Sequence, residues 1–348
     1  MQLTLPETAR PLTTRRPRLA FVGLGWIGRH RMEAIRAADV VDIVALADPD
    51  PAAVETALAL SPDARSGSGL ADVLDLQPDG VIIATPSARH AAETIAALEA
   101  GCAVFCQKPL GRSAGEVRQA METARRVDRL LAVDLSYRET AALRAIAPLA
   151  ARELGRVFAV DATFHNAYGP DKPWFYDRAL SGGGCLMDLG VHVLDMALRP
   201  LGYPEVTGVE AHLFAQGRPA TSADVEDYAV ATLRLAGGGV IRLACSWKLQ
   251  AGCDAVISCD FHGTEGGASM RNLDGSFYDF EAYRHHGNRT EQLTAGPDDW
   301  GGRAAVNFAR RLADGQRFDP AAEELVGLHD CIDRIYAAAD LAACRDPM

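Results

Sequence analysis

A glycine-rich turn between a short apolar strand and a helix most strongly limits what this chain can fold into. Residues 18–22 predict the strand, three glycines follow within the next six positions, and a helix is expected over 26–38. The first glycine permits a tight turn, the second lets a pyrophosphate approach the backbone, and the third permits close packing of helix on strand. Free N–H groups at the helix start attract phosphate. The residues expected to contact a dinucleotide here are Gly23, Gly25, Trp26, Ile27 and Gly28.

An acidic residue follows at the spacing that a dinucleotide site requires. Asp48 stands twenty residues after Gly28, directly beyond a second predicted strand over 40–46. A carboxylate there accepts hydrogen bonds from the ribose hydroxyls and repels a 2′-phosphate. Pro49 adds no cation that would attract such a phosphate. We therefore expect NAD as the cofactor, with NADP as the alternative, because Asp48 could instead serve only to shape the Asp-Pro-Asp-Pro turn.

Strands and helices alternate with short connections as far as residue 136. Further strands are expected over 81–84, 103–106 and 130–134, and further helices over 51–60, 90–100 and 113–127. This alternation is typical of a parallel sheet with helices on both faces. We predict an α/β fold in which a flexible leader (1–17) precedes a dinucleotide-binding Rossmann domain, a doubly wound parallel sheet over 18–136.

The pattern changes beyond residue 136. Helices are expected over 141–153, 185–199, 303–313 and 321–341, and strands over 156–163, 207–214, 227–235, 240–248 and 255–261. Alternating apolar and polar residues in runs joined by turns indicate antiparallel strands. Residues 137–348 are therefore predicted to form an α+β domain with a large open, mainly antiparallel sheet. Residues 283–289 are expected to form a solvated loop, the alternative being a hairpin near the cleft.

Composition excludes several classes of function. The chain of 348 residues has a formal net charge of -11, which argues against nucleic acid as a partner because phosphate binding requires a basic face. No apolar run approaches the ~20 residues that span a bilayer, so no membrane partner is expected. The eight cysteines show no paired metal-ligand spacing and no signal peptide precedes them. We expect reduced thiols, no metal site and a cytoplasmic protein.

Residues expected to contact the cofactor follow two of the predicted strands, at the sheet edge where ligands of such folds bind. These residues are Thr85, Pro86, His90, Gln107 and Lys108. A lysine at a strand end beside the nicotinamide can hydrogen-bond a substrate oxygen. A lone Lys-Pro pair is more often a surface turn, so the position alone does not decide its role.

A second group of titratable residues lies in a later predicted helix. Asp188, His192 and Asp195 are spaced i, i+4 and i+7, so one helix face would present all three. Histidine has an unperturbed pKa of about 6.5, which suits proton exchange with an alcohol or ketone. Asp188 would orient the ring or bind a substrate hydroxyl. The alternative is a core histidine with solvated aspartates.

Together these segments resemble the Gfo/Idh/MocA family of glucose–fructose oxidoreductases, inositol dehydrogenases and rhizopine-catabolism proteins. The motifs that carry the resemblance are the glycine loop, Thr85-Pro86 with His90, Gln107-Lys108-Pro109, Ser136-Tyr137-Arg138, the block from Lys172 to Asp195, and Gly263-Thr264-Glu265-Gly266. The resemblance covers nearly all of the chain after the leader. It implies a homodimer or homotetramer formed through the open sheet of the second domain.

The resemblance also implies an activity, the NAD(P)-dependent transfer of a hydride to or from a carbinol or keto carbon of a sugar, inositol or related polyol. Lys108 and His192 would be the catalytic acid–base pair, with Asp188 assisting. The family usually has glutamate before this lysine, and Gln107 here removes a negative charge. The candidates for substrate contacts are Arg138, His165, Tyr168, Trp174 and Tyr176.

Two other functions use the same fold. An NAD-dependent glycoside hydrolase would oxidise its substrate transiently and leave no net NADH. A non-catalytic regulatory protein would bind the dinucleotide without turnover. The presence of both Lys108 and His192 argues against the second alternative.

Overall fold

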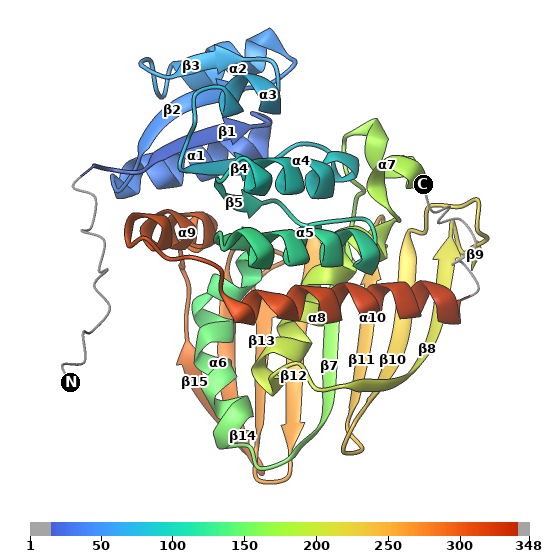
Figure 1. Cartoon of the computed structure of the whole chain (residues 1–348). Coiled ribbons are helices and arrows are strands. Elements are labelled where there is room, and N and C mark those ends of the chain that lie inside the picture. The colour runs from blue at the N-terminus through green and yellow to red at the C-terminus, as the bar shows by residue number, and fades with distance from the viewer. Residues whose placement is uncertain (1–14, 340–348) are drawn as a thin grey trace, which may run out of the picture.

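The N-terminal half of the chain forms a six-stranded parallel sheet with the strand order β3-β2-β1-β4-β5-β6. The structure is a computed structural model and describes residues 15–339 (Figure 1). The strands are β1 (Arg18–Val22), β2 (Asp42–Ala47), β3 (Arg65–Gly67), β4 (Gly80–Ile83), β5 (Ala103–Cys106) and β6 (Leu131–Val133). The helices are α1 (Trp26–Ala38), α2 (Pro51–Leu58), α3 (Leu70–Leu74), α4 (Ser87–Glu99) and α5 (Ala114–Val127). The predicted doubly wound sheet is confirmed.

Local capping explains where several of these helices begin. The Asp50 side chain accepts a hydrogen bond from the Ala52 N–H, and Pro51 occupies the first turn of α2. Ser113 accepts from the Glu116 N–H at the start of α5. Both sites satisfy backbone donors that a helix leaves free at its N-terminus. The short β3 and α3 were not predicted. The three residues of β3, Arg-Ser-Gly, carry no apolar run, and α3 has only five residues.

The second half is built on a nine-stranded sheet with the order β15-β14-β13-β12-β7-β11-β10-β8-β9. Its neighbouring strands are antiparallel except for the parallel pair β7 and β11. The strands are β7 (Val157–Asn166), β8 (Val206–Ala215), β9 (Arg218–Pro219), β10 (Tyr228–Leu235), β11 (Val240–Ser246), β12 (Ala255–Gly263), β13 (Gly267–Asn272), β14 (Phe280–His286) and β15 (Arg289–Thr294). The predicted open, mainly antiparallel sheet is confirmed.

One expectation for this sheet was wrong. Residues 283–289 lie in the β14–β15 hairpin at the edge of the sheet, and they do not form a solvated loop. None of the hairpin residues lines the large cleft described below. Charged and histidine side chains on both faces of this edge hairpin conceal the apolar alternation that would have predicted it.

Helices cover one face of the nine-stranded sheet. These are α6 (Ala141–Arg152), α8 (Val191–Leu198) and α10 (Glu324–Ala338), and the strands run behind them (Figure 1). Shorter helical segments are the 3-10 turns η1 (Ser136–Glu139), η2 (Pro173–Tyr176), η4 (Arg199–Leu201) and η5 (Pro320–Glu323), the helix α7 (Arg178–Ser181) and the π-helix η3 (Leu186–Gly190). Within the described part of the chain, no helix packs on the opposite face. On β10, partly exposed Tyr228, Val230 and Thr232 of that face alternate with buried Ala229 and Ala231.

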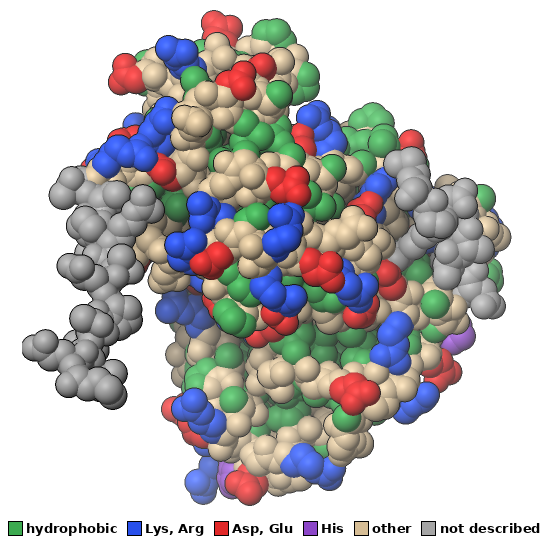
Figure 2. Space-filling view, viewed as in Figure 1, with side chains coloured by type: hydrophobic (Ala, Val, Ile, Leu, Met, Phe, Trp, Pro, Cys, Tyr) green, Lys and Arg blue, Asp and Glu red, His purple; other side chains and the backbone are tan. Residues whose placement is uncertain are grey.

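The last helices of the chain return to the first half. Helix α9 (Arg303–Ala313) packs into the core below the parallel sheet, where the Phe308 and Phe105 ring centroids are 5.5 Å apart. Helix α10 lies along α5 and is joined to it by the ion pair Arg118–Asp330, while Arg125–Glu323 joins α5 to η5 directly before α10. Figure 2 shows basic and acidic side chains interspersed over this face. A boundary at residue 136 therefore does not separate the two cores completely.

Some expectations concern residues outside the described range. Residues 1–14 of the predicted leader, Cys344 and the end of the last predicted helix lie outside residues 15–339. None of the helices between residues 15 and 339 has the length and apolar character needed to cross a membrane.

Candidate active site

A cleft of about 750 Å³ runs between the carboxyl ends of the parallel strands and the start of α8. Its walls come from the glycine loop, the segments after β4, β5 and β6, the loop after β7, and η3 with α8. This volume suits a small-molecule or cofactor site, and the carboxyl edge of a parallel sheet is where such ligands bind. The cleft is therefore the candidate active site.

The glycine loop has the shape that a pyrophosphate requires. Gly23 has φ +90°, and a Cβ added there would lie 2.4 Å from the Ala84 carbonyl carbon. A Cβ on Gly28 would lie 2.1 Å from the Gly23 carbonyl oxygen, so Gly28 serves the packing of α1 and does not line the cleft. Gly25 has no atom within 4 Å of its Cβ position. The backbone at Gly25, with Trp26 and Ile27 beside it, is thus open to the cleft.

Asp48 lines the same cleft and also shapes the chain around it. Its Oδ2 accepts a hydrogen bond of 2.7 Å from the Leu24 N–H of the glycine loop, and its Oδ1 accepts one of 2.9 Å from the Asp50 N–H. The turn-shaping alternative considered from the sequence is therefore part of its role. The neighbouring lining residues Pro49, Ser68 and Gly69 carry no positive charge.

Thr85, Pro86 and His90 line the cleft as expected. The His90 ring nitrogens lie 2.5 Å from the Thr85 carbonyl oxygen and 2.7 Å from the Pro109 carbonyl oxygen, so the ring links the ends of β4 and β5. Burial lowers the pKa of His90 below its usual value. The Lys108–Pro109 peptide is cis.

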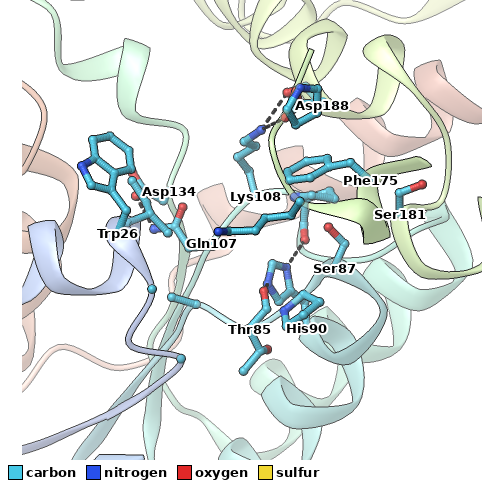
Figure 3. A pocket seen from close by; sticks show the side chains of 18 of the residues that line it. Trp26, Thr85, Ser87, His90, Gln107, Lys108, Asp134, Phe175, Ser181 and Asp188 are labelled. Atoms are coloured by element: carbon cyan, nitrogen blue, oxygen red, sulfur yellow. Dashed lines mark hydrogen bonds and ion pairs between the residues drawn. The ribbon is translucent and has the colours of Figure 1, made fainter. Parts of the chain in front are cut away.

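Lys108 and Asp188 form an ion pair across the cleft (Figure 3). The Lys108 Nζ donates to Asp188 Oδ1 at 2.5 Å and to the Asp188 carbonyl oxygen at 2.8 Å. The Trp247 indole donates to the other carboxylate oxygen at 3.1 Å. Both charged side chains are mostly buried, at 19% and 15% exposure, which strengthens their attraction. Asp188 thus orients Lys108 and makes no hydrogen bond to the His192 ring.

His192 lies in the cleft wall beside this pair. Its side chain packs against the Tyr137 ring, with 4.9 Å between ring centroids, and against Phe164. Its Nδ1 is buried and has no hydrogen-bond partner among residues 15–339. Burial, followed by the positive charges of Lys108 and Arg31, lowers the pKa of His192 well below 6.5. The imidazole is therefore neutral at neutral pH and able to accept a proton.

Asp195 and Arg138 lie outside the cleft, contrary to expectation for Arg138. The Arg138 guanidinium donates to the Asp195 carboxylate at 2.5 and 2.7 Å and to Tyr203 Oη at 2.8 Å. Neither residue lines the cleft. Asp188, His192 and Asp195 would share one face of a regular α-helix. Asp188 belongs instead to the π-helical η3, so the three side chains do not share one face.

Three other substrate candidates also lie outside the cleft lining, whereas Trp174 is part of it. His165 points to the open face of the sheet, where it bonds Ser246 and stacks on Tyr228. Successive strand residues face opposite ways, so Phe164 and Asn166 line the cleft in its place. Tyr168 and Tyr176 are exposed on the loop after β7.

Several functional candidates were missed from the sequence. Asn166 lines the cleft and has a buried Oδ1 without a partner among residues 15–339. Trp247 holds Asp188, and the buried Asp134 contacts Gln107. Asp134 at a parallel strand end was a signal that could have been used, whereas the Trp247 contact depends on sheet pairing that no local pattern predicts. No group of three metal-ligating side chains lies together in the described range.

Comparisons with known proteins agree with this geometry. Residues 17–135 match the model of an oxidoreductase family with an NAD-binding Rossmann fold, and residues 142–269 match the C-terminal domain of GFO/IDH/MocA proteins. The chain belongs to the Gfo/Idh/MocA family. The family assignment made from the sequence motifs is therefore confirmed, and with it an NAD-binding Rossmann domain in an oxidoreductase.

Relatives within the Gfo/Idh/MocA family bear names of sugar-converting enzymes. The chain is 30% identical over 273 residues to a putative UDP-kanosamine synthase oxidoreductase subunit of Amycolatopsis mediterranei, covering 73% of this chain and 75% of that protein. It is 31% identical over 238 residues to the D-glucoside 3-dehydrogenase of Escherichia coli. That alignment covers 64% of each chain, less than two thirds of the relative.

Solved structures share the fold over nearly the full length. GenD2 from gentamicin A biosynthesis, in complex with NAD, superimposes with a TM-score of 0.79 and 25% identity, covering 97% of both chains. Levoglucosan dehydrogenase in complex with NADH and L-sorbose gives a TM-score of 0.77 at 22% identity, covering 94% of this chain and 97% of that one. The Gfo/Idh/MocA fold class predicted from the sequence is thus confirmed.

Proposed function

We propose that the protein is an NAD(P)-dependent oxidoreductase that transfers a hydride between nicotinamide and a carbinol or keto carbon of a sugar, inositol or related polyol. One observation carries this proposal. The Lys108–Asp188 ion pair and the neutral His192 face the same cleft as the glycine loop. A dinucleotide site and an acid–base pair in one cleft are the two parts that alcohol oxidation requires.

His192 acts as the general base when the substrate alcohol is oxidised. Its buried, neutral imidazole takes the hydroxyl proton, and in the reverse direction the protonated ring returns it. The rings of Tyr137 and Phe164 exclude water from one side of the imidazole and fix its position. A bound nicotinamide ring supplies the acceptor or donor of the hydride.

Lys108 stabilises the negative charge that develops on the substrate oxygen. Its ammonium group is held by Asp188 and the Asp188 carbonyl, and it keeps a third N–H for the substrate. Asp188 holds Lys108 in place through its own bond to Trp247. Donation by a prepositioned, mostly buried charge is worth more than donation in water.

NAD is the proposed cofactor in preference to NADP. The Asp48 carboxylate lines the cleft at the spacing from the glycine loop that is typical of a ribose-binding acid, and the neighbouring lining residues are neutral. A 2′-phosphate there would meet a negative charge without a compensating cation.

A sugar or polyol substrate is supported by the cleft and by the names of the relatives. Trp174 offers an aromatic face, and the unpartnered Asn166 Oδ1 can accept a hydrogen bond from a hydroxyl. One of the relatives described above is named as a D-glucoside 3-dehydrogenase. Buried polar groups of this kind discriminate strongly among hydroxyls.

The remaining assignments are also proposals. Residues 18–136 would bind the dinucleotide, and residues 137–348 the substrate and a second copy of the chain through the open sheet face, giving a homodimer or homotetramer. A cytoplasmic location is supported by the seven described cysteines, all of which are free thiols.

The test is a panel of inositols, aldoses, keto-sugars and glycosides, screened for a change in NADH absorbance. Lys108→Ala is expected to lower kcat about 1,000-fold, within the range for loss of an acid–base or oxyanion group, while the Kd for NAD stays within a few-fold. Lys248→Ala is the matched control, because Lys248 lies outside the cleft lining. Full turnover in Lys108→Ala would defeat the proposal.

A further inference from the structure

A buried ion pair lies beneath the cofactor side of the cleft. The Arg31 Nε donates to Asp134 Oδ2 at 2.5 Å, and the two side chains are 6% and 0% exposed. Arg31 comes from α1, the helix that begins at the glycine loop, and Asp134 directly follows β6. The pair therefore joins the loop expected to bind pyrophosphate to the far end of the parallel sheet.

Gln107 binds to the same carboxylate oxygen. Its Nε2 donates to Asp134 Oδ2 at 2.5 Å. This bond identifies the amide nitrogen of Gln107 as the atom that faces Asp134, because only the nitrogen can donate to a carboxylate. The amide oxygen of Gln107 then remains as an acceptor, and no partner for it exists among residues 15–339. Gln107 directly precedes Lys108 and lines the cleft.

One side-chain acceptor of Asp134 has no donor within the part of the chain that the structure describes. Both of its hydrogen bonds use Oδ2, and its buried Oδ1 has no partner among the described residues. A buried carboxylate oxygen without a donor is costly, and native proteins rarely retain one. Asp134 also lines the cleft, so a bound molecule can supply the donor.

The position of these acceptors in the cleft indicates which group of a bound dinucleotide could donate a hydrogen bond to them. Gln107 and Asp134 lie between Trp26 and Lys108, while Asp188 and Phe175 lie on the other side of Lys108 (Figure 3). Strands β5 and β6 belong to the half of the sheet beyond the crossover between β1 and β4, where a dinucleotide that starts at the glycine loop places its second half. The nicotinamide carboxamide carries an NH2 group there.

We propose that Asp134 Oδ1 and the amide oxygen of Gln107 both accept hydrogen bonds from the carboxamide NH2 of the nicotinamide, and that Arg31 holds Asp134 in place. This pair of acceptors is called the seat below. The inference rests on the proposed nicotinamide cofactor and adds what orients its ring. Two acceptors converging on one NH2 group fix the rotation of the ring about its glycosidic bond. They thereby decide which face of the ring is turned toward Lys108 and His192.

Binding of two dinucleotides, measured by calorimetry without substrate, tests the seat. The first is NAD, and the second is the analogue with 3-acetylpyridine, in which a methyl group replaces the NH2. The wild type is expected to bind NAD at least tenfold more tightly than the analogue, the size expected of hydrogen bonds to a charged acceptor. In Asp134→Asn, the Asn oxygen stays with Arg31 and Gln107, so its NH2 turns toward the cofactor. The ratio of the two Kd values is then expected to fall to about one.

Asp195→Asn is the matched control. Asp195 is also a buried aspartate paired with an arginine, but it does not line the cleft, so this variant is expected to keep the wild-type ratio. If Asp134→Asn does not fold, Gln107→Met removes the other acceptor at similar side-chain length and must lower the ratio as well.

Two results overturn the seat, and they are distinguishable from each other. An unchanged ratio in Asp134→Asn or Gln107→Met, with NAD still binding, defeats the seat and leaves the proposed function intact. Failure of the wild type to bind NAD at all defeats both.

Discussion

At the scale of single residues, the site depends on a mostly buried aspartate, Asp188, that pairs with Lys108 and not with His192. Asp188 binds Lys108 and Trp247, and His192 has no carboxylate partner in the described range. An imidazole in this position meets two effects of the same sign. Burial and the nearby positive charges of Lys108 and Arg31 both disfavour its protonated form.

The pH profile of oxidation follows from this environment. Because the pKa of His192 in the folded protein lies well below 6.5, the base stays neutral at pH values where a free histidine is already protonated. The acidic limb of kcat/KM is expected at a pH below 6.5, and it should disappear in a residual-activity His192→Asn variant. The free energy of unfolding should also fall as pH drops below 6.5, because the unfolded chain takes up the proton first. An acidic limb above pH 6.5 would contradict the assigned base.

At the scale of elements, the start of η3 is held by a carboxylate distant in sequence. The Glu226 Oε1 accepts from the Gly184 N–H at 2.9 Å, the Leu186 N–H at 3.1 Å and the Tyr336 hydroxyl at 2.7 Å. Glu226 is fully buried, and burial raises its pKa. This side chain thus links α10 to the start of η3, the π-helix that carries Asp188.

Removing this carboxylate is expected to destabilise the fold. Glu226→Ala leaves buried donors without a partner, and we expect a loss of about 3 kcal/mol in the free energy of unfolding, measured by urea denaturation. Glu226→Gln keeps an acceptor oxygen for the two backbone N–H groups and is expected to lose only about 1 kcal/mol. Equal stability of the alanine variant and the wild type would show that η3 does not depend on Glu226.

The sequence predicted those parts of the site that depend on local order. The glycine loop, Asp48 and Lys108 lie at element ends that the apolar pattern marks, and His192 lies within a predicted helix. Gly23, Gly25, Asp48, Lys108 and His192 all line the cleft. His165 was misplaced because strand alternation sends it to the opposite face from Phe164, and the strand register was unknown. Trp247 directly follows β11, whose parallel pairing with β7 brings it to Asp188, and no pattern of neighbours predicts that contact.

At the scale of the whole molecule, the nine-stranded sheet has one face without a helix in the described part of the chain. Val230 lies on this face in β10, an interior strand of the sheet, and is paired with Ala244 and His212 on the adjacent strands. We propose that a second copy of the chain packs on this face of the sheet.

A charge placed at this position tests self-association. Val230→Glu is expected to convert the proposed dimer or tetramer to a monomer in light scattering, because an unpaired charge would be buried in the interface. The control Ala151→Glu places the same charge on the exposed side of α6 and should leave the assembly unchanged. A monomeric wild type, or an unchanged mass for Val230→Glu, would refute the interface.

The proposed hydride transfer is tested most directly by following the hydrogen itself. Substrates from the active part of the panel, deuterated at the carbinol carbon, are incubated with NAD, and the reduced cofactor is analysed by mass spectrometry. The proposed function predicts NADH heavier by one deuterium. Reduced cofactor without deuterium, or a cleaved glycoside with the cofactor unchanged, would contradict it.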